Sequence, residues 1–129
     1  MAQSLNTKVD FNIKATSFAG LGTYGDVMVG DVAFEFYNER NVEDYIQIPW
    51  EEVDHVAAEV VGRMITRFAI FVRQGGHFAF STRDNKATLR AMRAYLPDEK
   101  LQRSASFFDV IKAGVRSIGT MLTGGGKRS

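Results

Sequence analysis

The sequence contains no cysteine, and none of its apolar runs approaches the length needed to cross a membrane. The absence of thiols excludes disulfide scaffolds, catalytic cysteines and thiolate metal sites, and it suits a reducing compartment. The first residues, MAQSLNTK, are polar and lack the apolar stretch of a secretion signal. We therefore expect a cytoplasmic protein, with a peripheral place at the inner face of the cell membrane as an open alternative.

Sequence motifs of common enzyme classes are also absent. The chain has no G-x-S-x-G, no H-E-x-x-H and no Walker sequence, so acyl transfer, zinc hydrolysis and phosphoryl transfer lack their usual residues. His55 follows an acidic stretch, but adjacent strand residues point to opposite faces, so Asp54 and His55 do not predict a shared metal site. His77 lies beside two glycines and is expected to be structural. We expect no enzymatic activity, no cofactor and no bound metal.

A glycine motif at residues 20–27, GLGTYGDV, matches the G-x-G-x-x-G-x-V pattern of phosphate-binding loops. In dinucleotide-binding proteins the glycines precede a helix, whereas the residues after Val27 are β-branched and aromatic around Gly30-Asp31, which predicts a β-hairpin. In protein kinases the pattern works with a paired lysine, a catalytic loop and D-F-G, which this chain lacks. The motif is therefore interpreted as a turn between strands.

Charge is divided unevenly along the chain. Residues 1–59 contain eleven acidic and three basic residues, a balance of −8, whereas residues 60–129 contain four acidic and thirteen basic residues, a balance of +9. The two halves could neutralise each other, or the fold could carry an acidic and a basic side. Nucleic-acid binding is not expected, because the pI is only about 8.0 and no aromatic-basic repeat is present.

Alternation of apolar and polar residues predicts seven short strands in the first two thirds of the chain. Their apolar positions include Val9–Ala15, the hairpin around Gly30-Asp31, Tyr45–Ile48, Val53–Val61, Phe68–Val72 and Phe78–Phe80. From Asp84 the period changes to about 3.6, which predicts a helix ending before Pro97. Seven strands followed by one helix are typical of a mainly β, pleckstrin-homology-like open antiparallel barrel capped by a helix.

The residues after Pro97 predict a second helix. Ser106-x-x-Asp109 resembles a capping box, and one apolar stripe follows. The stripe consists of Phe107, Phe108, Ile111, Val115, Ile118 and Leu122. The expected domain organisation is a barrel domain over residues 6–97, a C-terminal amphipathic helical extension over 98–123 and a disordered basic tail over 124–129.

Three interpretations of this amphipathic helix remain open. It could pack on its own barrel or on another copy of the chain, dock onto a different protein, or lie in a membrane interface. Basic residues suggest a second binding surface, since Arg83, Lys86, Arg90 and Arg93 project along one side of the first helix. With Arg67 and Arg73 on the preceding strands, this face could receive phosphate groups or an acidic protein surface, or be a solvated face.

Several stretches resemble the ManO family of small bacterial proteins, whose genes lie beside operons of mannose-type sugar phosphotransferase systems. The resemblance is carried by GDVAFEFYNERNVEDYIQIPWEEVDHV, RFAI, STRDNKATLRAMRAYLP and RSASFFDVIKAG. It covers residues 6–119, and residues 34–50 are its most distinctive part. The stretch IQIPWEEVDHV also resembles pleckstrin-like and GRAM-like domains, which agrees with the expected fold.

The ManO resemblance implies a cytoplasmic accessory or regulatory protein of a mannose-type phosphotransferase system, and it implies no catalytic residue. The leading hypothesis is a non-enzymatic interaction module that docks through the basic helix face and the C-terminal helix. Its partner would be a component of the transporter, with self-association also open. The alternative is a membrane-lipid-binding or small-ligand-binding pleckstrin-like domain.

Overall fold

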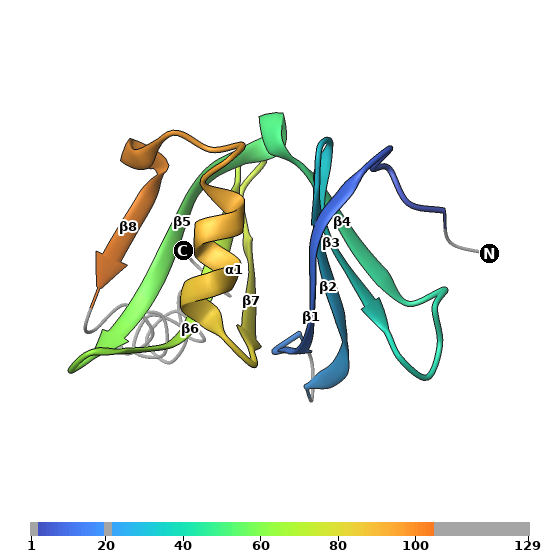
Figure 1. Cartoon of the computed structure of the whole chain (residues 1–129), viewed down its shortest axis with the longest axis horizontal. Coiled ribbons are helices and arrows are strands. Elements are labelled where there is room, and N and C mark those ends of the chain that lie inside the picture. Colours follow the sequence, from blue (N-terminus) through green and yellow to red (C-terminus); the bar gives the residue numbers. More distant parts are fainter. Residues whose placement is uncertain (1–2, 20–21, 105–129) are drawn as a thin grey trace, which may run out of the picture.

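The computed structural model describes residues 3–19 and 22–104, which form one eight-stranded sheet and one α-helix (Figure 1). The strand order in the sheet is β4-β3-β2-β1-β7-β6-β5-β8, and all neighbours are antiparallel except β5 and β8. The elements are β1 (Val9–Ser17), β2 (Thr23–Gly30), β3 (Ala33–Asn38), β4 (Tyr45–Pro49), η1 (Trp50–Glu52), β5 (Val53–Val61), β6 (Met64–Val72), β7 (His77–Thr82), α1 (Asn85–Met92), η2 (Asp98–Lys100) and β8 (Leu101–Ser104).

Aromatic residues from three strands meet at the centre of the core. Phe34 of β3, Phe68 of β6 and Phe80 of β7 are fully buried. Their ring centroids are 4.9 Å apart for Phe34 and Phe80 and 6.1 Å apart for Phe34 and Phe68. Each such side chain contributes about 1.5–3 kcal/mol through burial, so the curled sheet is held by residues far apart in the sequence.

The sheet opens where β1 meets β7, and α1 covers the opening. β1 pairs with β2 along its length but with β7 only over Ala15–Ser17. α1 packs against β6, β7, β1 and β2, and in Figure 1 it stands in front of β6 and beside β7. Its buried residues include Thr88 and Met92. Asp84 begins the helix, because its side chain accepts a hydrogen bond of 3.0 Å from the Ala87 amide.

The predicted fold class is confirmed: the described part of the chain is mainly β, open and barrel-like, with one helix after the strands. The helix is shorter than the predicted 84–96, because tight turns replace it after Met92. Leu96, beyond the end of α1, remains buried in the core.

Residues 98–104 correct the predicted start of the helical extension. They form η2 and β8 instead of an α-helix. β8 adds an eighth strand by pairing in parallel with β5, from Val56 with Leu101 to Glu59 with Ser104. This strand binds backbone groups that β5 would otherwise expose at the edge of the sheet.

The antiparallel order places the connections at two opposite ends of the barrel. The ends of β1, β3, β5 and β7 and the starts of β2, β4, β6 and α1 lie at the lower end in Figure 1, which we call the hairpin end. The β2–β3, β4–β5 and β6–β7 connections and the end of α1 lie at the upper end, which we call the opposite end. Since β8 is parallel to β5, the chain leaves Ser104 in the direction of the hairpin end.

The opposite end is closed by the N-terminal segment. Asn6 accepts hydrogen bonds from the amides of Val32 (2.8 Å) and Ala33 (2.7 Å) and donates to the buried carboxylate of Glu35 (3.1 Å). The segment passes so close to Gly30 that a Cβ there would lie 2.3 Å from the Asn6 side chain. This end of the barrel therefore depends on a glycine and on a fully hydrogen-bonded asparagine.

Trp50 adds a second closure at the same end. Its indole Nε1 donates a hydrogen bond of 2.8 Å to the Gly30 carbonyl, and its ring stacks on Tyr95 at 5.4 Å between centroids. The Tyr95 hydroxyl in turn donates to the Asp10 carboxylate. The chain between α1 and β8 is thus tied to η1 and to β1.

Candidate interaction surface

The predicted basic face of the first helix is largely present in the structure. Lys86 and Arg90 are one helical turn apart on α1, and Arg83 precedes the helix by two residues. All three are exposed, and none has an ion-pair partner among residues 3–19 and 22–104. We call Arg83, Lys86 and Arg90 the basic surface.

Arg93, the fourth residue predicted for this face, is occupied within the chain. Its Nε and Nη2 atoms both lie 3.1 Å from Oδ1 of Asp98, which follows Pro97 in η2. The pair is exposed, so it contributes only about 0–1 kcal/mol to stability, but it neutralises the end of the basic row. Arg93 is therefore a weaker candidate for partner binding than the other three cations.

The two strand arginines do not extend the basic surface as predicted. Arg67 binds the Glu59 carboxylate at 3.1 Å, and its guanidinium lies 5.7 Å from the ring centroid of Phe18. Arg73 lies in the β6–β7 connection at the opposite end, where its amide donates to the Glu52 carbonyl. One arginine is therefore held by its own chain, and the other belongs to a different surface.

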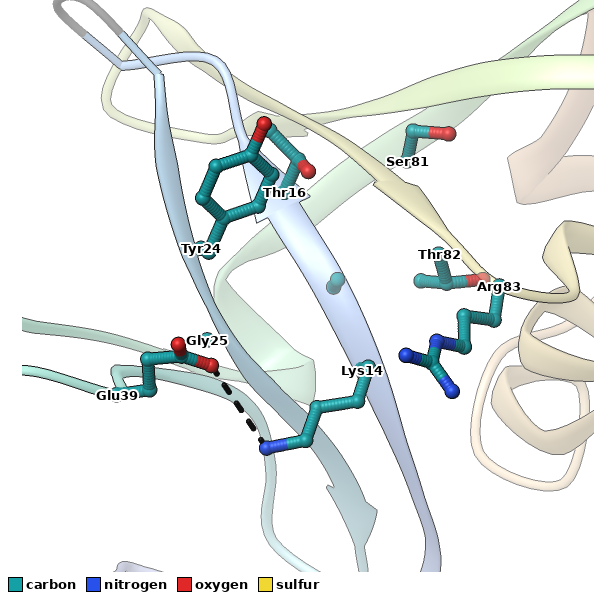
Figure 2. Close-up of a pocket in the computed structure, with 9 residues that line it drawn as sticks. Lys14, Thr16, Tyr24, Gly25, Glu39, Ser81, Thr82 and Arg83 are labelled. Atoms are coloured by element: carbon teal, nitrogen blue, oxygen red, sulfur yellow. Dashed lines mark ion pairs between the residues drawn. The ribbon is translucent and has the colours of Figure 1, made fainter.

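A polar pocket of about 470 Å³ adjoins the basic surface. Figure 2 shows Arg83 on one side of it and Lys14 near Glu39 on the other, with Tyr24 and Ser81 from neighbouring strands. The Lys14 ammonium lies 3.0 Å from the carboxylate of Asp26 and 3.8 Å from that of Glu39, so its charge is already balanced. Arg83 has no ion-pair partner among the described residues, so it is the cation of this pocket that can bind an external group.

Sequence reasoning missed Lys14 and Tyr24 as neighbours of Arg83. Alternation of apolar and polar residues indicated only that both side chains lie on the polar face of their strands. What joins them to Arg83 is the short pairing of β1 with β7 and the hydrogen bond from the Arg83 amide to the Lys14 carbonyl at 3.1 Å. This long-range contact has no counterpart in local sequence periodicity.

An apolar groove of about 350 Å³ lies between α1 and the β5–β8 edge. Ile65, Leu89 and Leu101 are among the apolar residues that line it, and Arg93 and Arg103 stand among the polar ones. The groove runs beside the strand from which the chain continues beyond Ser104. The predicted partner-binding residues Phe107, Phe108, Ile111, Val115, Ile118 and Leu122 lie outside the described residues.

The two histidines flank an aromatic ring on the outside of the sheet. His55 of β5, Phe71 of β6 and His77 of β7 form a ladder, with centroids 4.4 Å and 5.2 Å apart. Burial lowers the pKa of His77, which favours the neutral ring in this stack. The ladder is a cross-strand packing feature of the sheet.

The relation of His55 to Asp54 corrects one expectation. Strand alternation predicts that they point apart, yet His55 Nδ1 lies 2.7 Å from Asp54 Oδ2. The pairing register of β5 shifts between Val53 and His55, and this irregularity breaks the alternation. The hydrogen bond to His55 lowers the pKa of Asp54. No group of three potential ligands for a metal ion occurs among the described residues.

Within the described ranges, no helix is long and apolar enough to cross a membrane. The fold is similar to a solved structure, the C-terminal domain of an unknown protein from Leishmania infantum. The TM-score is 0.61 at 8% sequence identity, covering 68% of this chain and 83% of that chain. This likeness supports the fold alone.

No curated protein matches the sequence. A family model described as a domain of unknown function, DUF956, matches residues 1–115. The match includes the whole described barrel, the basic surface and the first residues beyond β8. The chain therefore belongs to the DUF956 family.

Proposed function

We propose that the protein is a non-enzymatic accessory or regulatory interaction module of a mannose-type sugar phosphotransferase system. The observation that carries the proposal is the basic surface, in which three exposed cations lack ion-pair partners among the described residues. The association with this transport system rests on the resemblance of the sequence to the ManO family. In this proposal the barrel is a scaffold that presents binding groups to a transporter subunit.

The chemistry of the basic surface specifies the kind of partner. Guanidinium groups bind carboxylates through two parallel hydrogen bonds, and the Lys86 ammonium adds a point charge. Cations at the rim of an interface accelerate association and select acidic partners more than they add to final affinity. A transporter subunit with an acidic surface therefore fits, and the binding should weaken as salt is raised.

The C-terminal segment is the second docking element in the proposal. Its sequence predicts an amphipathic helix with one apolar stripe, and glycines at positions 114 and 119 weaken such a helix until a partner surface supports it. The segment follows β8, which points toward the hairpin end. The basic surface begins at this same end, so one partner could reach both elements.

Co-purification of transporter subunits with the tagged full-length protein tests the basic surface. We expect Lys86→Glu combined with Arg90→Glu to reduce recovery about tenfold or more, because each change replaces attraction by repulsion. The matched control is Arg40→Glu with Arg73→Glu, which changes the net charge equally on two exposed residues away from α1. Equal recovery of the subunits with both double variants would overturn the role of the basic surface.

A version ending at Ser104 tests the C-terminal segment while keeping β8 intact. We expect it to lose the transporter subunits although its barrel unfolds with the same midpoint. Failure of the full-length protein to recover any mannose-type subunit, under low salt and without detergent disruption of the transporter, would contradict the proposed function itself.

A further inference from the structure

Exposed apolar side chains concentrate at the hairpin end. Eight large apolar side chains of the described residues are exposed, and six of them lie at or beside the connections of that end. These six are Phe18, Tyr24, Val42, Tyr45, Val61 and Met64. The three most exposed, Tyr24 at 71%, Met64 at 68% and Val61 at 58%, all belong to the group. Such clustering indicates a contact surface.

The β5–β6 hairpin carries two of these side chains on its tip, which we define as residues 61–64. Val61 and Met64 are directly paired across the strands, with Gly62 and Arg63 between them. Gly62 has φ of 61°, and a Cβ built on it would meet nothing within 4 Å. The tip therefore projects from the barrel as a small apolar pair beside an exposed arginine.

The charges beside the tip are cationic. The Asn85 side chain donates a hydrogen bond of 2.8 Å to the Ile65 carbonyl, which fixes the start of α1, and with it Lys86, beside the tip. The nearby carboxylates are already engaged, since Glu59 accepts from Arg67 and Thr66, and Asp84 caps α1. Arg63 and Lys86 are thus left to interact with an external anion.

The opposite end of the barrel differs in charge from the β5–β6 tip. It is rich in carboxylates contributed by the N-terminal half of β1, the β2–β3 turn, η1, the start of β5 and η2. These carboxylates are Asp10, Asp31, Glu51, Glu52, Asp54, Asp98 and Glu99, and the cations among them are Lys8, Arg73, Arg93 and Lys100. An anionic plane would therefore attract the tip while repelling the far end, and this would orient the molecule.

We propose that the hairpin tip binds the surface of an anionic lipid bilayer. Val61 and Met64 enter the headgroup region, where apolar side chains gain free energy, while Arg63 and Lys86 lie at the level of the phosphates. An exposed apolar pair beside two cations suits an anionic lipid surface, because such a surface receives apolar side chains and offers phosphates at the same depth. The lipid contact shares Lys86 with the basic surface but does not rest on transporter binding, and variants at Val61, Arg63 and Met64 leave Lys86 unchanged.

The path of the chain supports the same orientation. β8 runs parallel to β5, and its last residue, Ser104, pairs with Glu59 near the end that bears the tip. From Arg103 onward the sequence has five basic residues and one acidic residue. Charge complementarity to an anionic bilayer therefore continues beyond the barrel.

Vesicle flotation of the full-length protein tests the proposal. We expect binding to vesicles of phosphatidylcholine mixed with phosphatidylglycerol and none to phosphatidylcholine alone. Val61→Ser, Met64→Ser and Arg63→Gln in one chain should weaken binding roughly tenfold or more, of which the lost charge accounts for about fivefold. The matched control, Leu5→Ser, Val9→Ser and Arg73→Gln, changes exposed residues at the other end and should bind like the wild type.

A fluorescence measurement identifies the part of the molecule that touches the lipid. Because the chain has no cysteine, Met64→Cys and Val9→Cys each provide a single attachment point for an environment-sensitive dye. We expect the emission of the dye at position 64 to shift to shorter wavelength with anionic vesicles and that of the dye at position 9 to stay unchanged. Absence of the shift at position 64 would overturn the proposal, even if the C-terminal segment alone carried the protein to the vesicles.

The experiments can refute the lipid contact and the transporter binding independently of each other. Unchanged flotation of the tip variant, with the dye at position 64 still in water, refutes the lipid contact whatever the co-purification shows. Conversely, lipid binding that the tip variant loses and the matched control keeps, together with no recovered transporter subunit, supports the lipid contact and contradicts the transporter role.

Discussion

The two ends of the barrel differ in whether their side chains bind to other groups of the chain. At the opposite end, polar groups bind one another: Asn6 is bonded to the backbone and to Glu35, and Trp50 is bonded to Gly30 and stacked on Tyr95. At the hairpin end, the apolar side chains of the β5–β6 tip and the cations beside it remain exposed. The opposite end therefore contributes to stability, while the hairpin end keeps groups available for binding.

Residues that stabilise the fold and residues available for binding therefore lie at different ends of one small sheet. A buried donor or acceptor without a partner costs about 1–3 kcal/mol, so changes at the opposite end should destabilise the protein. Exposed side chains contribute little to the free energy of unfolding, so changes at the hairpin end should leave the fold intact. Variants at the two ends should therefore differ in their effect on stability.

The largest effect is expected for Trp50→Ala at the opposite end. The change removes a buried ring, its stack on Tyr95 and its hydrogen bond to Gly30, and should lower the free energy of unfolding by about 3–5 kcal/mol. Urea unfolding followed by circular dichroism measures this. Met64→Ala at the hairpin end is the control and should change it by no more than about 0.5 kcal/mol. Similar losses for both variants would refute the separation.

Much of the fold follows from local periodicity. Alternation predicted β5 with the bounds Val53–Val61 that the structure has, and the change of period at Asp84 predicted α1. β8 was not predicted, because Leu101 is the single apolar residue in Leu-Gln-Arg-Ser and the strand exists through parallel pairing with β5. Local periodicity cannot reveal pairing between segments so far apart in the chain.

The basic surface was only partly predictable from the sequence. Helical spacing brought Lys86 and Arg90 together, but it could not show that Arg93 would bind Asp98 across the turn at Pro97. Local alternation likewise gives no sign that Glu35 of β3 is buried. The structure buries it completely, since the N-terminal segment covers it and donates hydrogen bonds to its carboxylate.

A smaller effect is expected for Asn6→Ala, which opens the N-terminal closure. The change leaves the amides of Val32 and Ala33 without their acceptor and should lower the free energy of unfolding by about 1–3 kcal/mol. Asn12→Ala, at an exposed position of β1, is the matched control and should have little effect. Hydrogen exchange should show faster exchange at residues 32 and 33. Unchanged exchange at both amides would show that the N-terminal segment does not close this end.

The smallest effect concerns the hydrogen bond between Tyr95 and Asp10. It raises the pKa of Tyr95 to about 12 and lowers the pKa of Asp10. The tyrosine therefore holds its proton more tightly in the folded state, and its contribution to stability is complete below pH of about 10 and lost as pH rises toward about 12. The depressed pKa of Asp10 has the opposite sign, since its contribution is present above pH of about 4 and is lost in acid.

Tyr95→Phe tests this bond, because it keeps the ring on Trp50 but removes the hydroxyl. We expect the difference in urea midpoint between wild type and Tyr95→Phe to be constant near neutral pH. It should shrink in alkali, where Tyr95 loses its proton, and in acid, where Asp10 gains one. A difference that stays constant across the whole range would show that this bond does not couple the end of α1 to β1.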